Sequence, residues 1–151
     1  RRRWGIDPSA TTALDTPDTA VRHAFFNLAD VLKDTKPKEA IPLFQKACRG
    51  PFEVARLACG DGARVAYKAR EYDAAAEMSR ASCTDKWMGG CNVLGVLAAE
   101  GKGGAKEDEA LPAFEKACDA GDTTACENAK KNVAAACEGK VEEDKVYKFD
   151  K

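Results

Sequence analysis

Cysteines recur at a fixed spacing along this chain and are the residues best suited to do chemistry. Cys118 and Cys126 stand eight positions apart, and so do Cys83 and Cys91. Paired thiols can bind a metal, exchange with a disulfide or form a structural bridge. Zinc sites and thioredoxin-like centres use cysteines two residues apart or histidine partners, but the sequence has no C-x-x-C and one histidine, His23. We therefore expect no metal and no cofactor.

Other catalytic patterns are also missing. A Ser-His-Asp or Cys-His centre would need His23, which is expected to be an ordinary exposed side chain on a helix. The sequence contains neither a G-x-x-x-x-G-K phosphate loop nor an S-x-x-K motif, and the glycines at 101–104 fit a turn better than a nucleotide-binding loop. We expect that the protein is not an enzyme.

The segments that carry the cysteines repeat with a period of 35 residues: EAIPLFQKAC ends at Cys48, AAAEMSRASC at Cys83 and EALPAFEKAC at Cys118. A second set also aligns, namely HAFFNLADVL, RLACGDGARV, GGCNVLGVLA and TACENAKKNV, if one loop is three residues longer. This set brings three further cysteines into register: Cys59, Cys91 and Cys126. Helix-forming repeats of this length are typical of an α-solenoid, whose helix pairs bury their apolar faces by stacking.

We therefore predict an all-α solenoid of antiparallel helix pairs, with about three repeats and a closing helix. The pairs are expected at 19–33 with 37–48, 52–69 with 71–83, and 87–100 with 106–118, and the closing helix at 122–138. Pro42 and Pro112 fall inside this pattern, so their helices either start later or bend. The repeat domain then spans 19–138, between an extended arm or linker at 1–18 and a charged tail at 139–151, where Val146, Tyr147 and Phe149 can still pack.

The third repeat resembles the Sel-one-like repeat, a relative of the tetratricopeptide repeat. The resemblance covers the whole repeat and rests on Leu94, Gly95, Gly101, Gly103, Ala110, Phe114, Lys116, Ala117, Gly121 and Ala125. The cysteine pairs resemble those of the secreted, cysteine-rich bacterial branch of that family, whose repeats carry disulfides at this spacing. Ser79 departs from the pattern, because the equivalent positions hold Phe44 and Phe114.

The predicted helices place the paired cysteines at the turns between repeats. One cysteine closes a second helix and the other lies in the first turns of the next helix, so a tight turn can bring their Cα atoms within about 4.4–6.8 Å. We predict three disulfides: Cys48–Cys59, Cys83–Cys91 and Cys118–Cys126. The alternative is reduced, buried cysteines in a reducing cell. Disulfides imply a periplasmic, cell-surface or extracellular location. Cys137 remains, on the same helix face as Cys126, and is predicted to be a buried free thiol or, alternatively, to form an intermolecular bridge.

Charge and hydropathy exclude two classes of partner. The 24 basic and 25 acidic residues give a formal net charge of −1, so no strong field attracts nucleic acid. No segment approaches the roughly 18 apolar residues that a membrane-spanning helix needs. We expect no nucleic-acid partner and no membrane span.

These observations favour a non-enzymatic, exported module that binds a protein or peptide on the concave face of the solenoid, alone or as a subunit of a larger envelope assembly. Asn27 and Asn128 occupy equivalent positions, where an amide can bind a peptide backbone, and tetratricopeptide relatives contact ligands at such positions. One alternative is an envelope enzyme or a factor that binds cell wall or β-lactams. A nitrocefin assay and a muropeptide pull-down would separate the two. Another alternative is a purely structural spacer, which would show no partner in a cross-linking experiment.

Overall fold

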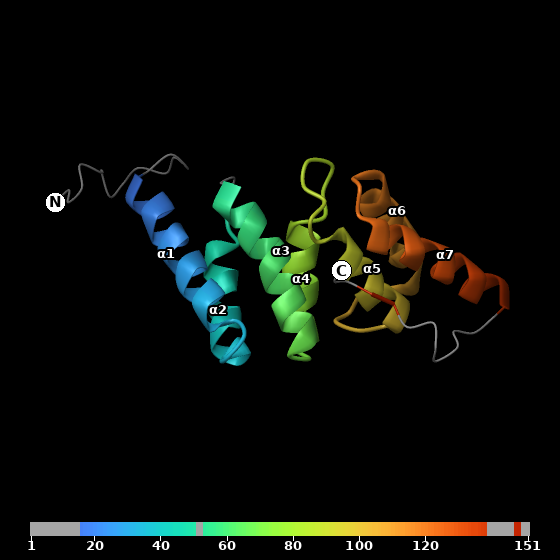
Figure 1. Cartoon of the computed structure of the whole chain (residues 1–151), viewed down its shortest axis with the longest axis horizontal. Coiled ribbons are helices and arrows are strands. Elements are labelled where there is room, and N and C mark those ends of the chain that lie inside the picture. The colour runs from blue at the N-terminus through green and yellow to red at the C-terminus, as the bar shows by residue number, and fades with distance from the viewer. Residues whose placement is uncertain (1–15, 51–52, 139–146, 149–151) are drawn as a thin grey trace.

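The protein is described by a computed structural model that covers residues 16–50, 53–138 and 147–148 (Figure 1). Most of the predicted arm (1–18) and tail (139–151) lies outside these residues. The described part of the chain is all-helical, which confirms the predicted fold class. Its elements are α1 (Thr16–Leu32), α2 (Pro37–Ala47), α3 (Glu53–Lys68), α4 (Tyr72–Ala81), α5 (Cys91–Glu100), the 3₁₀ helix η1 (Glu107–Glu109), α6 (Ala110–Asp119) and α7 (Thr123–Glu138).

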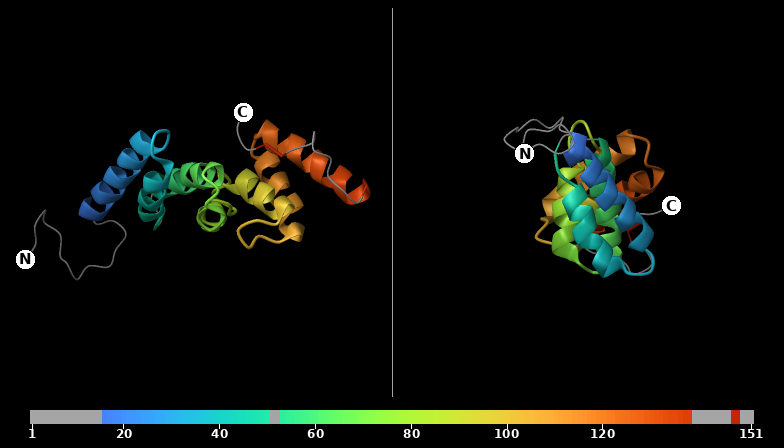
Figure 2. Two further views of the ribbon diagram at one scale, coloured as in Figure 1. Left: turned by 90° about the horizontal axis from the view of Figure 1, so that it is seen from below. Right: turned by 90° about the vertical axis from the view of Figure 1, so that its left-hand side faces the viewer.

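The helices pack in pairs that follow one another along the long axis of the molecule. Each helix packs against the next along the chain, and α1 also touches α3, α3 touches α5, and α5 touches α7. Figure 2 shows the same row from two further sides. We call the surface formed by α1, α3, α5 and α7 the first-helix face.

Small residues on the first helices make room for large ones on the second helices. A Cβ atom added at Gly95 would lie 2.5 Å from the ring of Phe114, and one at Gly62 would lie 2.7 Å from Cβ of Phe44. Both phenylalanines are fully buried. Glycine at position 95 therefore allows close approach of α5 and α6, the two helices of one pair, and glycine at position 62 allows close approach of α3 and α2, which belong to consecutive pairs.

The middle repeat solves the same packing problem differently. Ser79, at the position of the missing phenylalanine, is fully buried, and its hydroxyl donates to the carbonyl of Ala76 at 3.1 Å. The preceding residue, Met78, is also fully buried, and its sulfur reaches the place that a Cβ at Gly62 would take. The flexible thioether thus packs against Gly62, next to Cβ of Phe44 from the preceding repeat.

Three helices, α1, α5 and α6, start three or four residues away from the predicted positions. α5 begins at Cys91 rather than at residue 87, because the chain before it forms a loop in which the Trp87 amide donates to Oγ1 of Thr84 at 3.0 Å. Gly90 closes this loop, since its amide donates to the carbonyl of Ser82 at 3.0 Å. At the other end of the molecule, α1 begins at Thr16, three residues before the predicted start at 19.

The two internal prolines are accommodated in different ways. Pro112 stands in the first turn of α6, because η1 precedes that helix and delays its start to Ala110. A proline is tolerated there, since the first amides of a helix have no partner within it. Pro42 lies inside α2, where it removes one backbone hydrogen bond. Pro42 and Lys38, four residues earlier, are both exposed. Water can therefore reach the carbonyl of Lys38, which has no amide donor at position 42.

Three disulfides join each second helix to the next first helix, as predicted. The Cα atoms are 4.8 Å apart in Cys48–Cys59, 4.6 Å in Cys83–Cys91 and 4.6 Å in Cys118–Cys126, all within the range that a disulfide requires. Because such bridges persist in oxidising surroundings, they indicate that the protein resides in an oxidising compartment.

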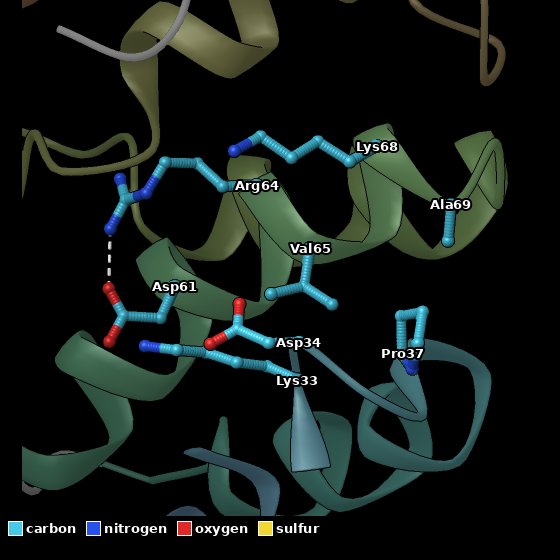
Figure 3. A pocket seen from close by; sticks show the side chains of 8 residues that line it. All are labelled: Lys33, Asp34, Pro37, Asp61, Arg64, Val65, Lys68 and Ala69. Atoms are coloured by element: carbon cyan, nitrogen blue, oxygen red, sulfur yellow. Dashed lines mark hydrogen bonds and ion pairs between the residues drawn. The ribbon is translucent and has the colours of Figure 1, made fainter. Parts of the chain in front are cut away.

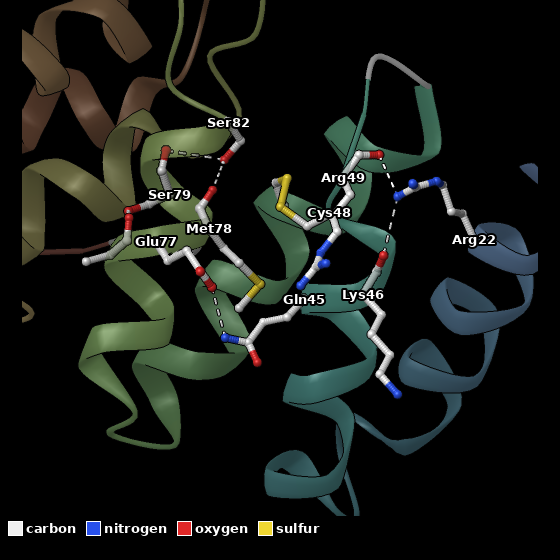
Figure 4. The surroundings of a disulfide bond; sticks show 11 residues. Arg22, Gln45, Lys46, Cys48, Arg49, Glu77, Met78, Ser79 and Ser82 are labelled. Carbon is white, nitrogen blue, oxygen red and sulfur yellow. Dashed lines mark hydrogen bonds between the residues drawn. A yellow bond between two sulfur atoms is a disulfide. The ribbon is translucent and has the colours of Figure 1, made fainter. Parts of the chain in front are cut away.

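The surroundings of the first disulfide tie three helices together (Figure 4). The guanidinium of Arg22, on α1, donates to the carbonyl of Arg49 at 2.8 Å. Gln45, on α2, donates to the carboxylate of Glu77, on α4, at 2.9 Å. The bridge therefore lies among polar contacts that hold α1, α2 and α4 in register.

Cys137 is a free thiol, but the prediction that it is buried was wrong, since its side chain is exposed. Helical periodicity places it on nearly the same face as Cys126. However, α7 has 16 residues and the packed α6 only 10, so the last turns of α7 run past their partner. A residue can share a face with a buried neighbour and still lie beyond the helix that would cover it.

None of the described helices combines the length and the apolar character that crossing a bilayer requires.

Candidate functional site

A charged pocket lies at the N-terminal end of the first-helix face (Figure 3). It has a volume of about 560 Å³ and opens between the α1–α2 turn and α3. Its charged lining comprises Lys33, Asp34, Asp61, Arg64 and Lys68.

Two of the positive charges of this pocket have acidic partners, one inside the pocket lining and one outside it. Arg64 forms an ion pair with Asp61, one helical turn away. Lys33 donates to Asp30 at 2.7 Å, and this hydrogen bond raises the pKa of Lys33 in spite of its partial burial. The pocket can therefore accept polar groups, but it presents no concentrated charge of one sign.

A second polar site lies at the other end of the molecule, where three asparagines of α5 and α7 and the ring of Phe114 on α6 contact residues 147–148. We call Asn92, Asn128, Asn132 and Phe114 the amide site. Asn128 is fully buried and Asn92 is 4% exposed. The Asn128 amide nitrogen donates to Oδ1 of Asn92 at 2.9 Å, so the two amides orient each other.

The amide site holds the backbone of a segment that is distant in sequence. The Lys148 amide donates to Oδ1 of Asn128 at 2.9 Å, and the Asn128 amide nitrogen donates to the carbonyl of Lys148. The same carbonyl also accepts a hydrogen bond from Asn92 at 2.8 Å. The carboxamide of Asn128 thus pairs with both backbone groups of one residue.

A stacked pair of aromatic rings lies next to this backbone contact. The ring of Tyr147 stacks on that of Phe114, with centroids 5.5 Å apart and an angle of 20° between the planes. The tyrosine is only 7% exposed, and its hydroxyl accepts a hydrogen bond from Asn132 at 3.3 Å. Because Phe114 packs directly onto Gly95, the small residue of α5 helps to place the ring that Tyr147 covers.

The two predicted backbone-binding asparagines have different surroundings. Asn128 lies in the amide site and contacts a peptide backbone, although that backbone belongs to its own chain. Asn27, at the equivalent position of α1, is exposed. The structure does not bring these two residues together, because they lie on the first and last helices of the row (Figure 1).

Sequence reasoning missed Asn92, Asn132 and the role of Phe114 in this site. Asn92 left a signal, since it is the one polar side chain in CNVLGVLA, a segment whose residues are all buried. A buried amide needs hydrogen-bond partners, so an asparagine inside an apolar helix indicates a polar contact. Nothing comparable marks Asn132, which stands among other polar residues of α7.

Two further polar contacts link neighbouring repeats. The Tyr67 hydroxyl donates to Glu100 at 2.6 Å, and burial together with this carboxylate raises the pKa of Tyr67. Arg80 forms an ion pair with Glu109, and this hydrogen bond, with one from the Lys106 amide, lowers the pKa of Glu109. These groups fix the relative position of neighbouring helices. Arg80 and Glu109 also line a pocket of about 520 Å³ together with Asp108 and Lys116, so its charged lining contains both signs.

Comparison of the chain with family models, with curated proteins and with solved structures gives no match. Chemically, the amide site can bind an extended backbone and an aromatic ring.

Proposed function

We propose that this protein is a non-enzymatic, exported repeat module that binds a protein or peptide on its first-helix face. The observation that carries this proposal is the two-way hydrogen bonding between Asn128 and the backbone of Lys148. A surface that holds one extended segment in this way has the chemistry to hold others, because backbone groups are common to all peptides.

The helix pairs, their 35-residue period and the glycine-containing turn of the third repeat support assignment to the Sel-one-like family. The three disulfides support its secreted, cysteine-rich branch and a place in the periplasm, at the cell surface or outside the cell. In that setting the module acts alone or as a subunit of an envelope assembly, and the curved inner surface of a solenoid is where its partner binds.

Site-specific photo-crosslinking tests this proposal. A photoreactive amino acid replaces Lys68, an exposed residue of α3 beside the charged pocket, in protein expressed in its native cell. The control places the same group at Glu115, an exposed residue of α6. We expect a discrete covalent adduct from position 68 and none from position 115.

The adduct is identified by mass spectrometry. Equal labelling from both positions would indicate non-specific collisions, and the absence of adducts from both would indicate a structural spacer. Either result contradicts binding on the first-helix face.

A further inference from the structure

Within the proposed binding function, the amide site has features that specify one kind of ligand. Its two most buried amides, Asn92 and Asn128, direct hydrogen bonds to the backbone at Lys148, whose own side chain is exposed. The contact therefore recognises the main chain at this position and places no demand on the side chain.

The backbone contact does exclude one residue type. The Lys148 amide donates to Oδ1 of Asn128 at 2.9 Å, and proline has no amide hydrogen to give. A segment with proline at this position would leave the buried Asn128 oxygen without its donor, which is costly in a site shielded from water. Every other residue type can supply both backbone groups.

The position before Lys148 is selective for an aromatic ring. Tyr147 is 7% exposed, stacks on Phe114 and receives a hydrogen bond from Asn132. A stacked aromatic pair adds to the free energy gained from burying the rings. The site thus fits an aromatic residue followed by any residue except proline.

The segment that occupies the site is attached to the same chain, after the end of α7 at Glu138. A tethered segment competes with free ligands at a high effective concentration, which for short linkers is on the order of millimolar. Yet the described contact consists of two residues, so a partner that makes the same contacts and additional ones along the first-helix face can displace it.

We propose that Tyr147 and Lys148 are an internal pseudo-ligand that occupies a peptide-binding site made by α5, α6 and α7. The external ligand is an extended protein segment that carries an aromatic residue followed by a residue other than proline. The internal segment blocks the site until such a partner displaces it, so the contact is autoinhibitory.

Fluorescence anisotropy with the full chain tests this proposal. The probe is a labelled peptide of residues 143–151, EDKVYKFDK. Tyr147→Ala in the protein removes the aromatic ring of the internal occupant and leaves the amide site intact. We expect this variant to bind the probe at least about tenfold more tightly than the wild type does, because the competitor is weakened.

Second-site variants locate the binding. Asn128→Ala, added to Tyr147→Ala, should abolish probe binding, whereas Glu127→Ala should leave it unchanged, because Glu127 is the exposed neighbour of Asn128 on α7. Circular dichroism and the number of alkylated thiols verify that each variant is folded. Equal binding with and without Asn128→Ala would overturn the proposal.

Altered probes test the ligand pattern. Peptides with Lys148→Ala should bind as the original does, and those with Lys148→Pro or Tyr147→Ala should not. Equal affinity of the alanine and proline peptides at position 148 would contradict the backbone contact.

Amide hydrogen exchange gives a readout that needs no substitution in the protein. In the wild type, the Lys148 amide is hydrogen-bonded to Asn128, so it should exchange slowly, and saturating unlabelled peptide should accelerate that exchange. Unchanged exchange at saturation would overturn the proposal. If these experiments fail while crosslinking from position 68 still captures a partner, the module binds proteins elsewhere on the first-helix face and only the pseudo-ligand is wrong.

Discussion

The carboxamide of Asn128 and the backbone of Lys148 exchange hydrogen bonds in both directions, across 20 residues of sequence. An asparagine that is fully buried near the start of the last helix therefore acts as the partner of an extended segment. This relationship makes the position unusually sensitive to small changes in its hydrogen-bonding groups.

Asn128→Asp should destabilise the protein by about 3 kcal/mol at neutral pH, because a carboxylate oxygen would face the carbonyls of Lys148 and Asn92 in a buried site. Burial raises the pKa of the introduced carboxyl above its unfolded value of about 3.9. The penalty is therefore complete above the raised pKa and disappears as the pH falls toward about 4. Urea unfolding at several pH values measures it.

Asn27→Asp is the matched control for this change. Asn27 is exposed at the equivalent position of α1, so the same substitution should alter the free energy of unfolding by no more than about 0.5 kcal/mol. Equal effects at the two positions would show that Asn128 is not buried against a backbone.

Alkylation of the native protein without reductant should label one thiol, Cys137, and alkylation after reduction should label all seven cysteines. Intact-mass spectrometry counts the labels. More than one label in protein isolated from its native compartment would contradict the three disulfides and the oxidising location inferred from them.

Removing one disulfide by the double substitution Cys83→Ala and Cys91→Ala should lower the free energy of unfolding by about 2.5 kcal/mol. The bridge joins two residues that are eight positions apart, and its loss restores conformational freedom to the unfolded chain. Cys137→Ala removes an exposed thiol that forms no disulfide. This substitution should change the free energy of unfolding by less than about 0.5 kcal/mol. Comparable losses in the two variants would mean that the bridge contributes little.

Gly95→Ala should destabilise the protein by about 2 kcal/mol. The new methyl group would lie 2.5 Å from the buried ring of Phe114, so the ring or the helix must move. Gly89→Ala is the control, because no atom lies within 4 Å of the methyl position there, and its effect should be near zero. Thermal unfolding of both variants measures the difference, and a tolerated Gly95→Ala would argue against close packing of α5 on α6.

Glu109→Gln should reduce stability at neutral pH and have no effect in acid. Arg80 holds the pKa of Glu109 below its usual value, so the ionised carboxylate stabilises the folded state. This contribution is complete above the unfolded pKa of about 4.3 and is lost as the pH falls through the lower folded value. The difference in melting temperature between wild type and variant, followed from pH 7 to below about 3, measures it. Asp108→Asn, in the same turn, should show a smaller difference at pH 7.

The cysteine pairs and the order of the helices could be predicted from sequence because both depend on periodicity. Each pair recurs at the same point of its repeat, so one alignment fixed all six positions. The start of α5 could not be predicted from the same pattern. Trp87 and Met88 are compatible with a helix, and only the closing of the loop by Gly90 on Ser82 decides that they stand outside it.

The amide site was less predictable because it depends on contacts between distant parts of the chain. Asn92 and Lys148 are 56 residues apart, and the charged segment around Lys148 has no period that would indicate a partner. The prediction that Cys137 is buried was wrong for a related reason. Periodicity assigns a residue to a face of its helix, whereas its exposure depends on how far the neighbouring helix extends.

The location of the disulfides between consecutive helix pairs, and not within them, has a mechanical consequence. When the ends of the molecule are pulled apart, α3 can separate from α4 while each remains covalently attached to its outer neighbour. The chain segments enclosed by the bridges cannot contribute to the stretched length, and the order of the stack survives the opening of any one pair. Under tension, the helix pairs should therefore open one at a time, and each opening should be reversible.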